Sequence, residues 1–251
     1  MSPAEKVDPL IADQLQAALL SAVIGREIIV LEQTGSTNDA ILQVAFSQGA
    51  SVSSLPAVAS AKEGPPSPIE QGLVVFAEHQ TAGRGQRGNR WESTVGKGLW
   101  FSILLRPNIQ LIDSGRLTIW AIQAVSDVIR IEFGLDPAIK LPNDVQLSGR
   151  KVAGVLVEMR AQHKAPHLAV VGIGINVNQF RGDFPAELQE RAISLAMALG
   201  RQVHRQNFAV ALLRNLDVTY REKFLKAVGA VNSSPAPTTT RDKRAAKFRM
   251  A

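Results

Sequence analysis

Short apolar segments rich in β-branched residues recur along this 251-residue chain and constrain its fold more than any other feature. Each is about as long as a strand, and they occupy residues 26–33, 72–79, 99–106, 138–141, 145–147, 151–159 and 167–177. The last four follow one another through short turns, which predicts antiparallel neighbours. Helical segments separate the earlier ones, which predicts crossovers. We therefore expect an α+β fold with a mixed, largely antiparallel β-sheet packed with helices.

Several other segments show helical periodicity. In residues 114–133 the apolar positions recur at helical spacing, and Gly134 is placed to end the helix. Asp8-Pro9 is typical of a helix start, so we expect a helix from there to Gly25. Further helices are expected over residues 36–46, 186–199 and 207–226.

Composition divides the chain into a folded body and two less regular segments. Residues 1–227 form the expected folded domain, interrupted at residues 50–70 by a loop rich in proline, serine and alanine that we expect to be flexible. Residues 228–251 combine proline, threonine and basic residues, a composition typical of a disordered tail.

Charge and cysteine content narrow the class of protein. The formal net charge is +6, but the last eleven residues supply most of it, so the charge does not indicate nucleic-acid binding by the body. The chain has no cysteine, which excludes disulfides and thiolate chemistry. We find no signal peptide and no apolar run long enough to span a membrane. A cytoplasmic protein is expected.

A glycine-rich loop, HQTAGRGQRGNRW at residues 79–91, contains the pattern G-x-G-x-x-G. A dinucleotide-binding turn requires a helix directly after the loop and an acidic residue about 20 positions later, and neither is present. The motifs of a kinase and of a Walker loop are also missing. Its arginines, Arg84, Arg87 and Arg90, suit binding of a phosphate or carboxylate, while a solvated basic turn is the alternative.

Other polar motifs each allow two interpretations. Ser36-Thr37-Asn38 at a strand-to-helix junction could cap the helix or bind a small polar ring. The Lys140–Asp144 segment could be only a turn, or could place a carboxylate in a site. Lys151 is either a strand-edge charge or a cation directed into a site. The strand glycines Gly172 and Gly174 indicate a bulge or a close approach to the backbone. We expect no metal site, because Pro166 interrupts the only histidine pair with helical spacing.

Taken together, five motifs resemble the biotin protein ligases in order and spacing, from about Arg26 to Tyr220. They are STN at 36–38, QTAGRGQRGNRWES from Gln80, KLPNDV from Lys140, GRKVAGVLVE from Gly149 and GIGINVN from Gly172. The resemblance implies the biotin/lipoate ligase catalytic fold, which is similar to class II aminoacyl-tRNA synthetases. We expect no helix-turn-helix DNA-binding domain ahead of it and no small C-terminal β-barrel after it.

The resemblance also implies an activity. An enzyme of this family joins biotin to ATP, forms biotinyl-5'-AMP and pyrophosphate, and transfers biotin to a lysine of a biotin carboxyl carrier domain. The implied substrates are biotin and ATP, with Mg²⁺ accompanying the ATP. The implied partner is the carrier domain of a biotin-dependent carboxylase. No DNA and no membrane are expected as partners, and a homodimer is compatible with the family.

Individual roles follow from the matching positions. As catalytic residues the resemblance implies Lys151, Arg84 and Asp144, the last as a base or orienting carboxylate. For biotin binding it implies Ser36, Thr37, Asn38, Gln80, Arg84, Gly85, Gln86 and Lys151. For ATP or adenylate binding it implies Arg87, Trp91, Lys140, Asn143 and Asn176. The loop from Gly83 to Trp91 is expected to close over the adenylate and exclude water.

One residue departs from the family pattern, and two alternative functions stay open. The family commonly has a second arginine where this chain has Gln86, so the loop carries one positive charge fewer at that position. A protein that binds biotin or biotinyl-AMP without turnover is the first alternative. A ligase for lipoate or another carboxylate is the second.

Overall fold

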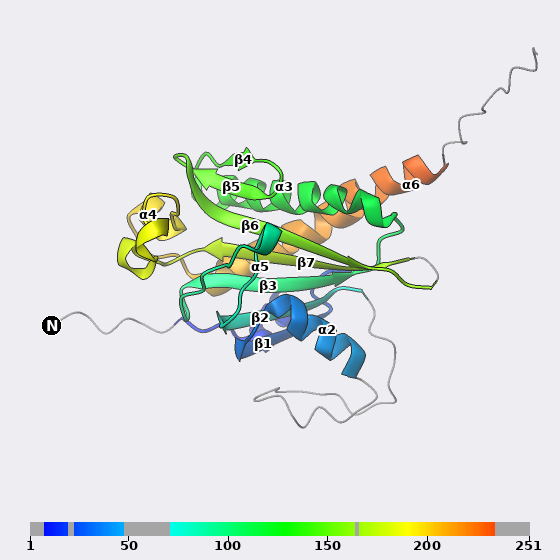
Figure 1. Cartoon of the computed structure of the whole chain (residues 1–251), viewed down its shortest axis with the longest axis horizontal. Coiled ribbons are helices and arrows are strands. Elements are labelled where there is room, and N and C mark those ends of the chain that lie inside the picture. The colour runs from blue at the N-terminus through cyan, green and yellow to red at the C-terminus, as the bar shows by residue number, and fades with distance from the viewer. Residues whose placement is uncertain (1–7, 20–22, 48–70, 164–165, 234–251) are drawn as a thin grey trace, which may run out of the picture.

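The structure is a computed structural model that describes residues 8–19, 23–47, 71–163 and 166–233 (Figure 1). The expected flexible loop at 50–70 lies outside these residues. The helices are α1 (Ala12–Ala18), α2 (Thr37–Ser47), α3 (Ser114–Phe133), α4 (Leu195–Leu199), α5 (Arg205–Thr219) and α6 (Lys226–Ser233), with a π-helical turn η5 (Tyr220–Leu225) joining the last two. The strands are β1 (Glu27–Thr34), β2 (Leu73–Gln80), β3 (Gly98–Leu105), β4 (Ala138–Lys140), β5 (Asp144–Leu147), β6 (Arg150–Arg160) and β7 (Leu168–Asn176).

The described strands form one mixed sheet in the order β1-β2-β3-β7-β6-β5-β4 (Figure 1). The β1 and β2 strands are parallel and every other neighbouring pair is antiparallel. Helix α2 connects β1 towards β2, so the parallel pair has the crossover that parallel strands require. The expected α+β architecture with a largely antiparallel sheet is confirmed.

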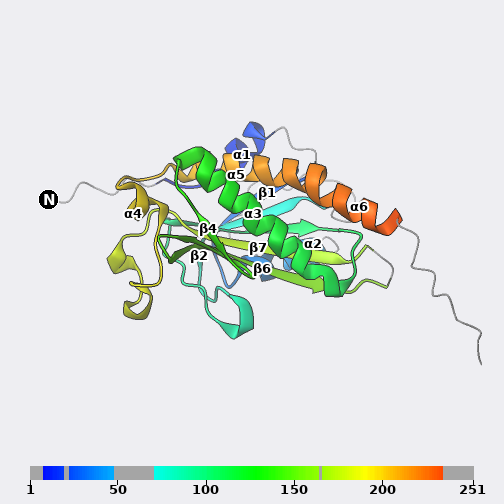
Figure 2. The ribbon, with the colours of Figure 1, turned by 90° about the horizontal axis from the view of Figure 1, so that it is seen from above.

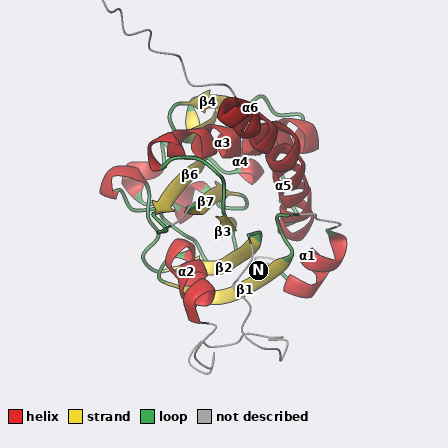
Figure 3. Ribbon diagram, turned by 90° about the vertical axis from the view of Figure 1, so that its right-hand side faces the viewer, coloured by secondary structure: helices red, strands yellow, loops and turns green. Residues whose placement is uncertain are grey.

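Helices cover the two faces of the sheet unequally. Helices α3 and α5 cover one face of the sheet (Figure 2). Odd-numbered residues of β3 and β7 pack with them in the larger apolar core. Helix α2 lies on the other side of the sheet (Figure 3). Even-numbered residues such as Leu104 and Val170 pack there in a smaller core with α2. Because the short α2 covers only part of its face, the glycine and polar positions of β3, β6 and β7 on that face are left for a site.

The helix α3 agrees with its sequence pattern at both ends. It spans Ser114–Phe133, its apolar residues are buried at the expected spacing, and Gly134 ends it with φ +64°. A non-glycine residue would be strained in this left-handed conformation. No helix among the described residues is long and apolar enough to cross a membrane.

Two helix predictions were wrong in their extent. Helix α1 begins only at Ala12, because the Asp8 carboxylate accepts a hydrogen bond from the Arg205 backbone N–H instead of capping its own helix, and it ends at Ala18, where the extended backbone of Leu19 follows. The helix expected over residues 186–199 is replaced by a 3₁₀ turn, Ala186–Leu188, and by α4. The backbone between them is used elsewhere, since Arg191 and Ile193 hydrogen-bond to the backbone of Lys151.

The predicted start of the disordered tail at residue 228 was also wrong. Helix α6 continues to Ser233, and Val228 is buried in the larger core. The physical reason is that this side chain continues the apolar face of α5 and η5, whose Tyr220 and Phe224 rings stack at 5.4 Å. The remaining tail residues, 234–251, lie outside the described part of the chain.

A buried ion pair joins the N-terminal segment to β2, β3 and α5. The Arg205 side chain is 1% exposed and donates hydrogen bonds to the Glu78 carboxylate at 2.7 Å and to the Gly98 carbonyl at 3.1 Å. It also contacts the Asp8 carbonyl. A buried charge of this kind is tolerated only while its partners stay in place.

We predict that Glu78→Gln lowers the free energy of unfolding by about 3 kcal/mol, because it leaves the Arg205 guanidinium buried without its counter-charge. Urea unfolding of the two proteins measures the difference. The control is Glu132→Gln, which removes a carboxylate from the exposed surface of α3. Equal unfolding midpoints for Glu78→Gln and the control would contradict the prediction.

Candidate active site

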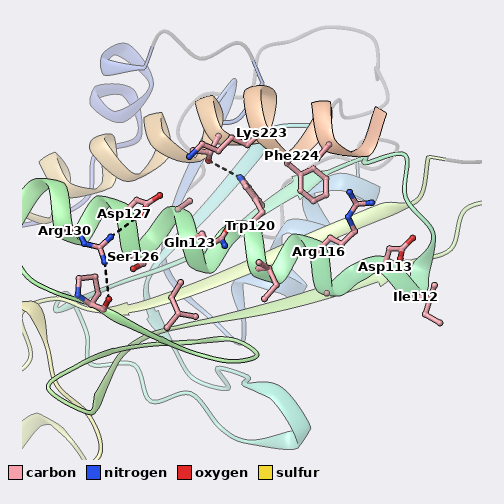
Figure 4. Close-up of a pocket in the computed structure, with 17 residues that line it drawn as sticks. Ile112, Asp113, Arg116, Trp120, Gln123, Ser126, Asp127, Arg130, Lys223 and Phe224 are labelled. Carbon is pink, nitrogen blue, oxygen red and sulfur yellow. Dashed lines mark hydrogen bonds and ion pairs between the residues drawn. The ribbon is translucent and has the colours of Figure 1, made fainter. Parts of the chain in front are cut away.

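The motif residues gather on the α2 face of the sheet, around a cavity of about 40 Å³. Its lining includes nine residues predicted from the sequence, which are Ser36, Thr37, Asn38, Gln80, Arg84, Gly85, Trp91, Asn143 and Lys151. A larger hollow of about 1070 Å³ lies between α3, β4 and the η5–α6 region and includes none of the predicted residues (Figure 4). The chemistry indicated by the motifs therefore belongs to the smaller cavity.

A buried polar network forms one wall of this cavity. The side-chain oxygen of Gln80 accepts hydrogen bonds from Thr37, from the backbone N–H at 2.8 Å and from the hydroxyl at 3.2 Å. The Ser102 hydroxyl lies 2.8 Å from Thr37 Oγ1 and 2.6 Å from Asn38 Oδ1. Buried polar groups that are partnered in this way have fixed orientations. The wall can therefore present hydroxyl and amide groups to a small polar ligand.

The sequence interpretation overlooked Ser102. It is fully buried in β3, on the same face as Trp100 and Leu104, within the otherwise apolar segment LWFSILLR. A single hydroxyl in a buried apolar strand needs a hydrogen-bond partner. This requirement could have identified Ser102 from the sequence as part of a polar network. Ser102 connects the helix-start motif to the sheet.

Three glycines, Gly154, Gly172 and Gly174, make the sheet surface beneath the cavity; we call them the glycine floor. A Cβ atom at position 172 would lie 2.3 Å from Asn38 Oδ1, and one at position 174 would lie 2.6 Å from a Trp91 ring atom. Gly154 and Gly174 are paired across β6 and β7. The strand glycines therefore allow a close approach to the backbone, and the groups that approach it are Asn38 and Trp91.

The Trp91 side chain lies over the glycine floor. Its ring meets that of Trp100 edge-on, with centroids 6.0 Å apart, and the Lys151 ammonium is 5.1 Å from its centroid. The indole Nε1 is buried and has no hydrogen-bond partner among the described residues. An unpaired buried donor is costly, so this position of Trp91 is one that a ligand could displace.

Two carboxylates hold Arg84 in the glycine loop. Its Nη2 donates to Asp39 Oδ1 at 3.0 Å and to Glu158 Oε2 at 3.1 Å, and its Nη1 contacts the other Asp39 oxygen. The hydrogen bond to Asp39 and the negative charge of Glu158 raise the pKa of the Arg84 guanidinium, against the effect of burial. Arg84 is therefore a permanent cation at the rim of the cavity. Neither of its carboxylate partners was among the predicted site residues.

The second cation of the cavity, Lys151, pairs with Asp144. Its ammonium lies 2.7 Å from Asp144 Oδ1. The two residues come from neighbouring strands, β6 and β5, and both are partly buried. The three residues predicted to be catalytic thus belong to two cation–carboxylate groups, and the cation of each group lines the cavity.

Backbone hydrogen bonds keep the glycine loop in a narrow turn. The Trp91 N–H donates to the Gly83 carbonyl at 2.9 Å, and the Gly85 N–H donates to the Asn89 carbonyl at 2.7 Å. A Cβ atom at position 83 would lie 2.6 Å from the Trp91 carbonyl oxygen, so only glycine fits there. The turn places Arg84 and Trp91 on the same cavity.

Five predicted residues do not line the cavity, and one of them, Asp144, is connected to it only through its ion pair with Lys151. Gln86 and Arg87 lie in the 3₁₀ turn of the loop, and Lys140 is exposed on β4. Asn176 is buried and donates to the backbone carbonyls of Ile193 and Lys151. Asn143, which does line it, donates to the Val155 carbonyl at 3.0 Å. Their assignment to ligand binding remains a prediction.

Comparisons with known sequences identify similar proteins. Residues 54–176 match the model of the biotin/lipoate A/B protein ligase family. A biotin--[acetyl-CoA-carboxylase] ligase of Mycobacterium tuberculosis is 34% identical over 218 residues, which cover 83% of this chain and 70% of that protein. The bifunctional ligase/repressor BirA of Bacillus subtilis is 40% identical over 152 residues, 61% of this chain and 47% of that protein. The chain thus spans about half the length of the BirA relatives that it matches.

Solved structures with the same fold include a biotin protein ligase from Aquifex aeolicus in complex with biotin and ATP. It is 28% identical, with a TM-score of 0.56 and coverage of 81% of this chain and 76% of that one. A mutant of the same Aquifex protein in complex with biotin has a TM-score of 0.59 at 27% identity, covering 81% and 75% of the two chains.

We predict that Gly174→Ala moves the Trp91 indole off the glycine floor, because the added Cβ overlaps the ring. Overpacking of this kind costs about 1–3 kcal/mol, and the freed indole becomes accessible to acrylamide. Quenching of tryptophan emission measures the change, with a Trp91→Phe background to assign it. The matched control is Gly115→Ala, where nothing lies within 4 Å of the new Cβ. Unchanged quenching in Gly174→Ala would contradict this placement of Trp91.

Proposed function

We propose, because the chain belongs to the biotin/lipoate A/B protein ligase family, that it is an ATP-dependent biotin ligase. In the first reaction the biotin carboxylate attacks the α-phosphorus of ATP, which forms biotinyl-5'-AMP and releases pyrophosphate. In the second, a lysine amine of a biotin carboxyl carrier domain attacks the acyl carbon, which forms an amide and releases AMP. Relatives and fold neighbours named for biotin support the choice over lipoate.

One observation carries the proposal. Arg84 and Lys151 line the same cavity as the Ser36-Thr37-Asn38 motif and Gln80. The first reaction brings a carboxylate to a triphosphate, so cations fixed in advance around the reacting oxygens lower its barrier. The polar wall supplies directional hydrogen bonds for the neutral ring of biotin. A cavity with both features suits a ligand that has a polar ring and a carboxylate.

The remaining residues have roles that follow from their positions. Asp144 is proposed to accept the proton of the carrier lysine, once ligand binding has changed its pairing with Lys151. Trp91, above the glycine floor, is proposed to cover the nucleotide. Mg²⁺ is proposed to enter with ATP and to be held by its phosphates. The described residues include no group of three histidines or carboxylates that could hold a metal by themselves.

Biotin-dependent exchange of labelled pyrophosphate into ATP tests the first reaction, and transfer of biotin to a carrier domain tests the second. We predict exchange in the purified chain, and a loss of about 10²–10³-fold in kcat/KM for Lys151→Met, since the variant lacks a cation at the reacting oxygens. The control is Lys223→Met on the exposed surface of η5.

The outcomes separate the alternatives. If Lys151→Met exchanges pyrophosphate as fast as the wild type, this lysine has no part in the mechanism. Tight binding of biotin without any exchange would show a binding protein instead of a ligase. Exchange that depends on lipoate and not on biotin would show the other branch of the family.

We also predict that biotin binding moves Trp91. The cavity of about 40 Å³ is far smaller than the roughly 300 Å³ or more of typical small-molecule sites, and the Trp91 ring fills the space above the glycine floor. Titration with biotin should therefore change tryptophan emission in the wild type and leave the emission of Trp91→Phe nearly constant. Biotin binding, verified by calorimetry, without any emission change would contradict the prediction.

A further inference from the structure

Arg84 is tied to two elements that lie far from it in sequence. Asp39 is in the first turn of α2, and Glu158 is near the end of β6. The guanidinium therefore joins the glycine loop to a helix and to the sheet at the same time. We call Asp39 and Glu158 the carboxylate clamp.

The sequence context of each carboxylate has an ordinary explanation that does not require Arg84. An acidic residue in the first turn of a helix is favoured by the helix dipole, which accounts for Asp39. Glu158 continues the alternation of Gly154 and Leu156 on the cavity face of β6, where an edge position commonly carries charge. Neither explanation predicts that both carboxylates meet one arginine.

The contacts are specific in geometry. Asp39 meets the two terminal nitrogens of Arg84 with its two oxygens, the bidentate arrangement that fixes the plane of a guanidinium. Glu158 meets Nη2 from another side and also accepts a hydrogen bond from Asn38 Nδ2 at 2.7 Å. The clamp therefore connects the orientation of Arg84 to the polar wall of the cavity.

Stability of the fold does not account for the clamp. The three side chains are 38%, 49% and 36% exposed, and ion pairs at such exposure contribute little to folding free energy. Two carboxylates around one guanidinium also leave a local excess of negative charge, which is unfavourable beside a site for anions. The pairing of Arg84 with two carboxylates therefore contributes little to stability and places extra negative charge beside the cavity. Its effect on the position of the glycine loop explains it better.

We propose that Asp39 and Glu158 are positioning residues, which hold the glycine loop in its narrow turn and fix the direction of the Arg84 guanidinium. These hydrogen bonds engage Nη1 and Nη2, and no carboxylate in the described part of the chain is bound to Nε–H. Nε–H and the second hydrogen of Nη1 are therefore the donors that Arg84 offers to an incoming anion. The consequence for catalysis rests on the proposed function, because there the anion is the carboxylate of biotin.

Limited trypsin digestion of the protein without ligands tests the positioning of the loop. Asp39→Asn and Glu158→Gln should each speed cleavage after Arg84, Arg87 or Arg90 by about three- to fivefold, which is the scale of one exposed ion pair, and the double variant should be faster still. Mass spectrometry of the fragments identifies the bond cut. Glu132→Gln, which removes the same charge from α3, should match the wild type. Equal loop cleavage in all four variants would overturn the proposal.

Pyrophosphate exchange with the same proteins tests the direction of the guanidinium. We expect KM for biotin to rise several-fold in Asp39→Asn and in Glu158→Gln while KM for ATP stays near the wild-type value, and Asp39→Glu to recover part of the loss. Faster loop cleavage with unchanged KM for biotin would overturn the positioning role. Wild-type protein without exchange would instead refute the proposed function, and the digestion result would still decide whether the clamp holds the loop.

Discussion

The absence of side chains at the glycine floor is the constraint on which the site depends. At Gly172 and Gly174 a single added carbon would overlap Asn38 and Trp91, respectively. Because these side chains can lie directly against the backbone of β7, the start of α2 and the glycine loop both reach the same small area of the sheet. The polar wall, the indole and the two cations meet there, although they come from segments more than a hundred residues apart.

The cations of the site are neutralised before any ligand arrives. Arg84 is bound by Asp39 and Glu158, and Lys151 is bound by Asp144. Strong positive charge would attract many anions without discrimination. Cations that already have carboxylate partners instead favour a ligand that also forms hydrogen bonds with the polar wall and displaces the Trp91 indole. Selectivity in such a site comes from the combination of contacts and not from net charge.

Much of the fold and the family could be predicted from local sequence. Short apolar segments rich in β-branched residues located the strands within about a residue, and Gly134 marked the end of α3. The five motifs predicted the family, which the comparisons confirm. The motifs were informative because the fold brings residues of all five to the same cavity.

The errors came from contacts between distant segments. No local pattern shows that Asp8 accepts from the Arg205 backbone, or that residues 191–193 lie along β6 instead of continuing a helix. Glu158 and Ser102 were overlooked for the same reason. Each has an unremarkable local context, and each acquires its partners only when the sheet is assembled.

The pairing of residues 191–193 with β6 has a consequence for the ammonium of the site. The Lys151 N–H donates to the Arg191 carbonyl, its carbonyl accepts from the Ile193 N–H, and the Asn176 side chain reaches the same carbonyl. The lysine is therefore seated by a downstream segment that does not itself line the cavity. Substitutions in that segment therefore change the position of the Lys151 backbone, and with it the ammonium, without altering any residue that lines the cavity.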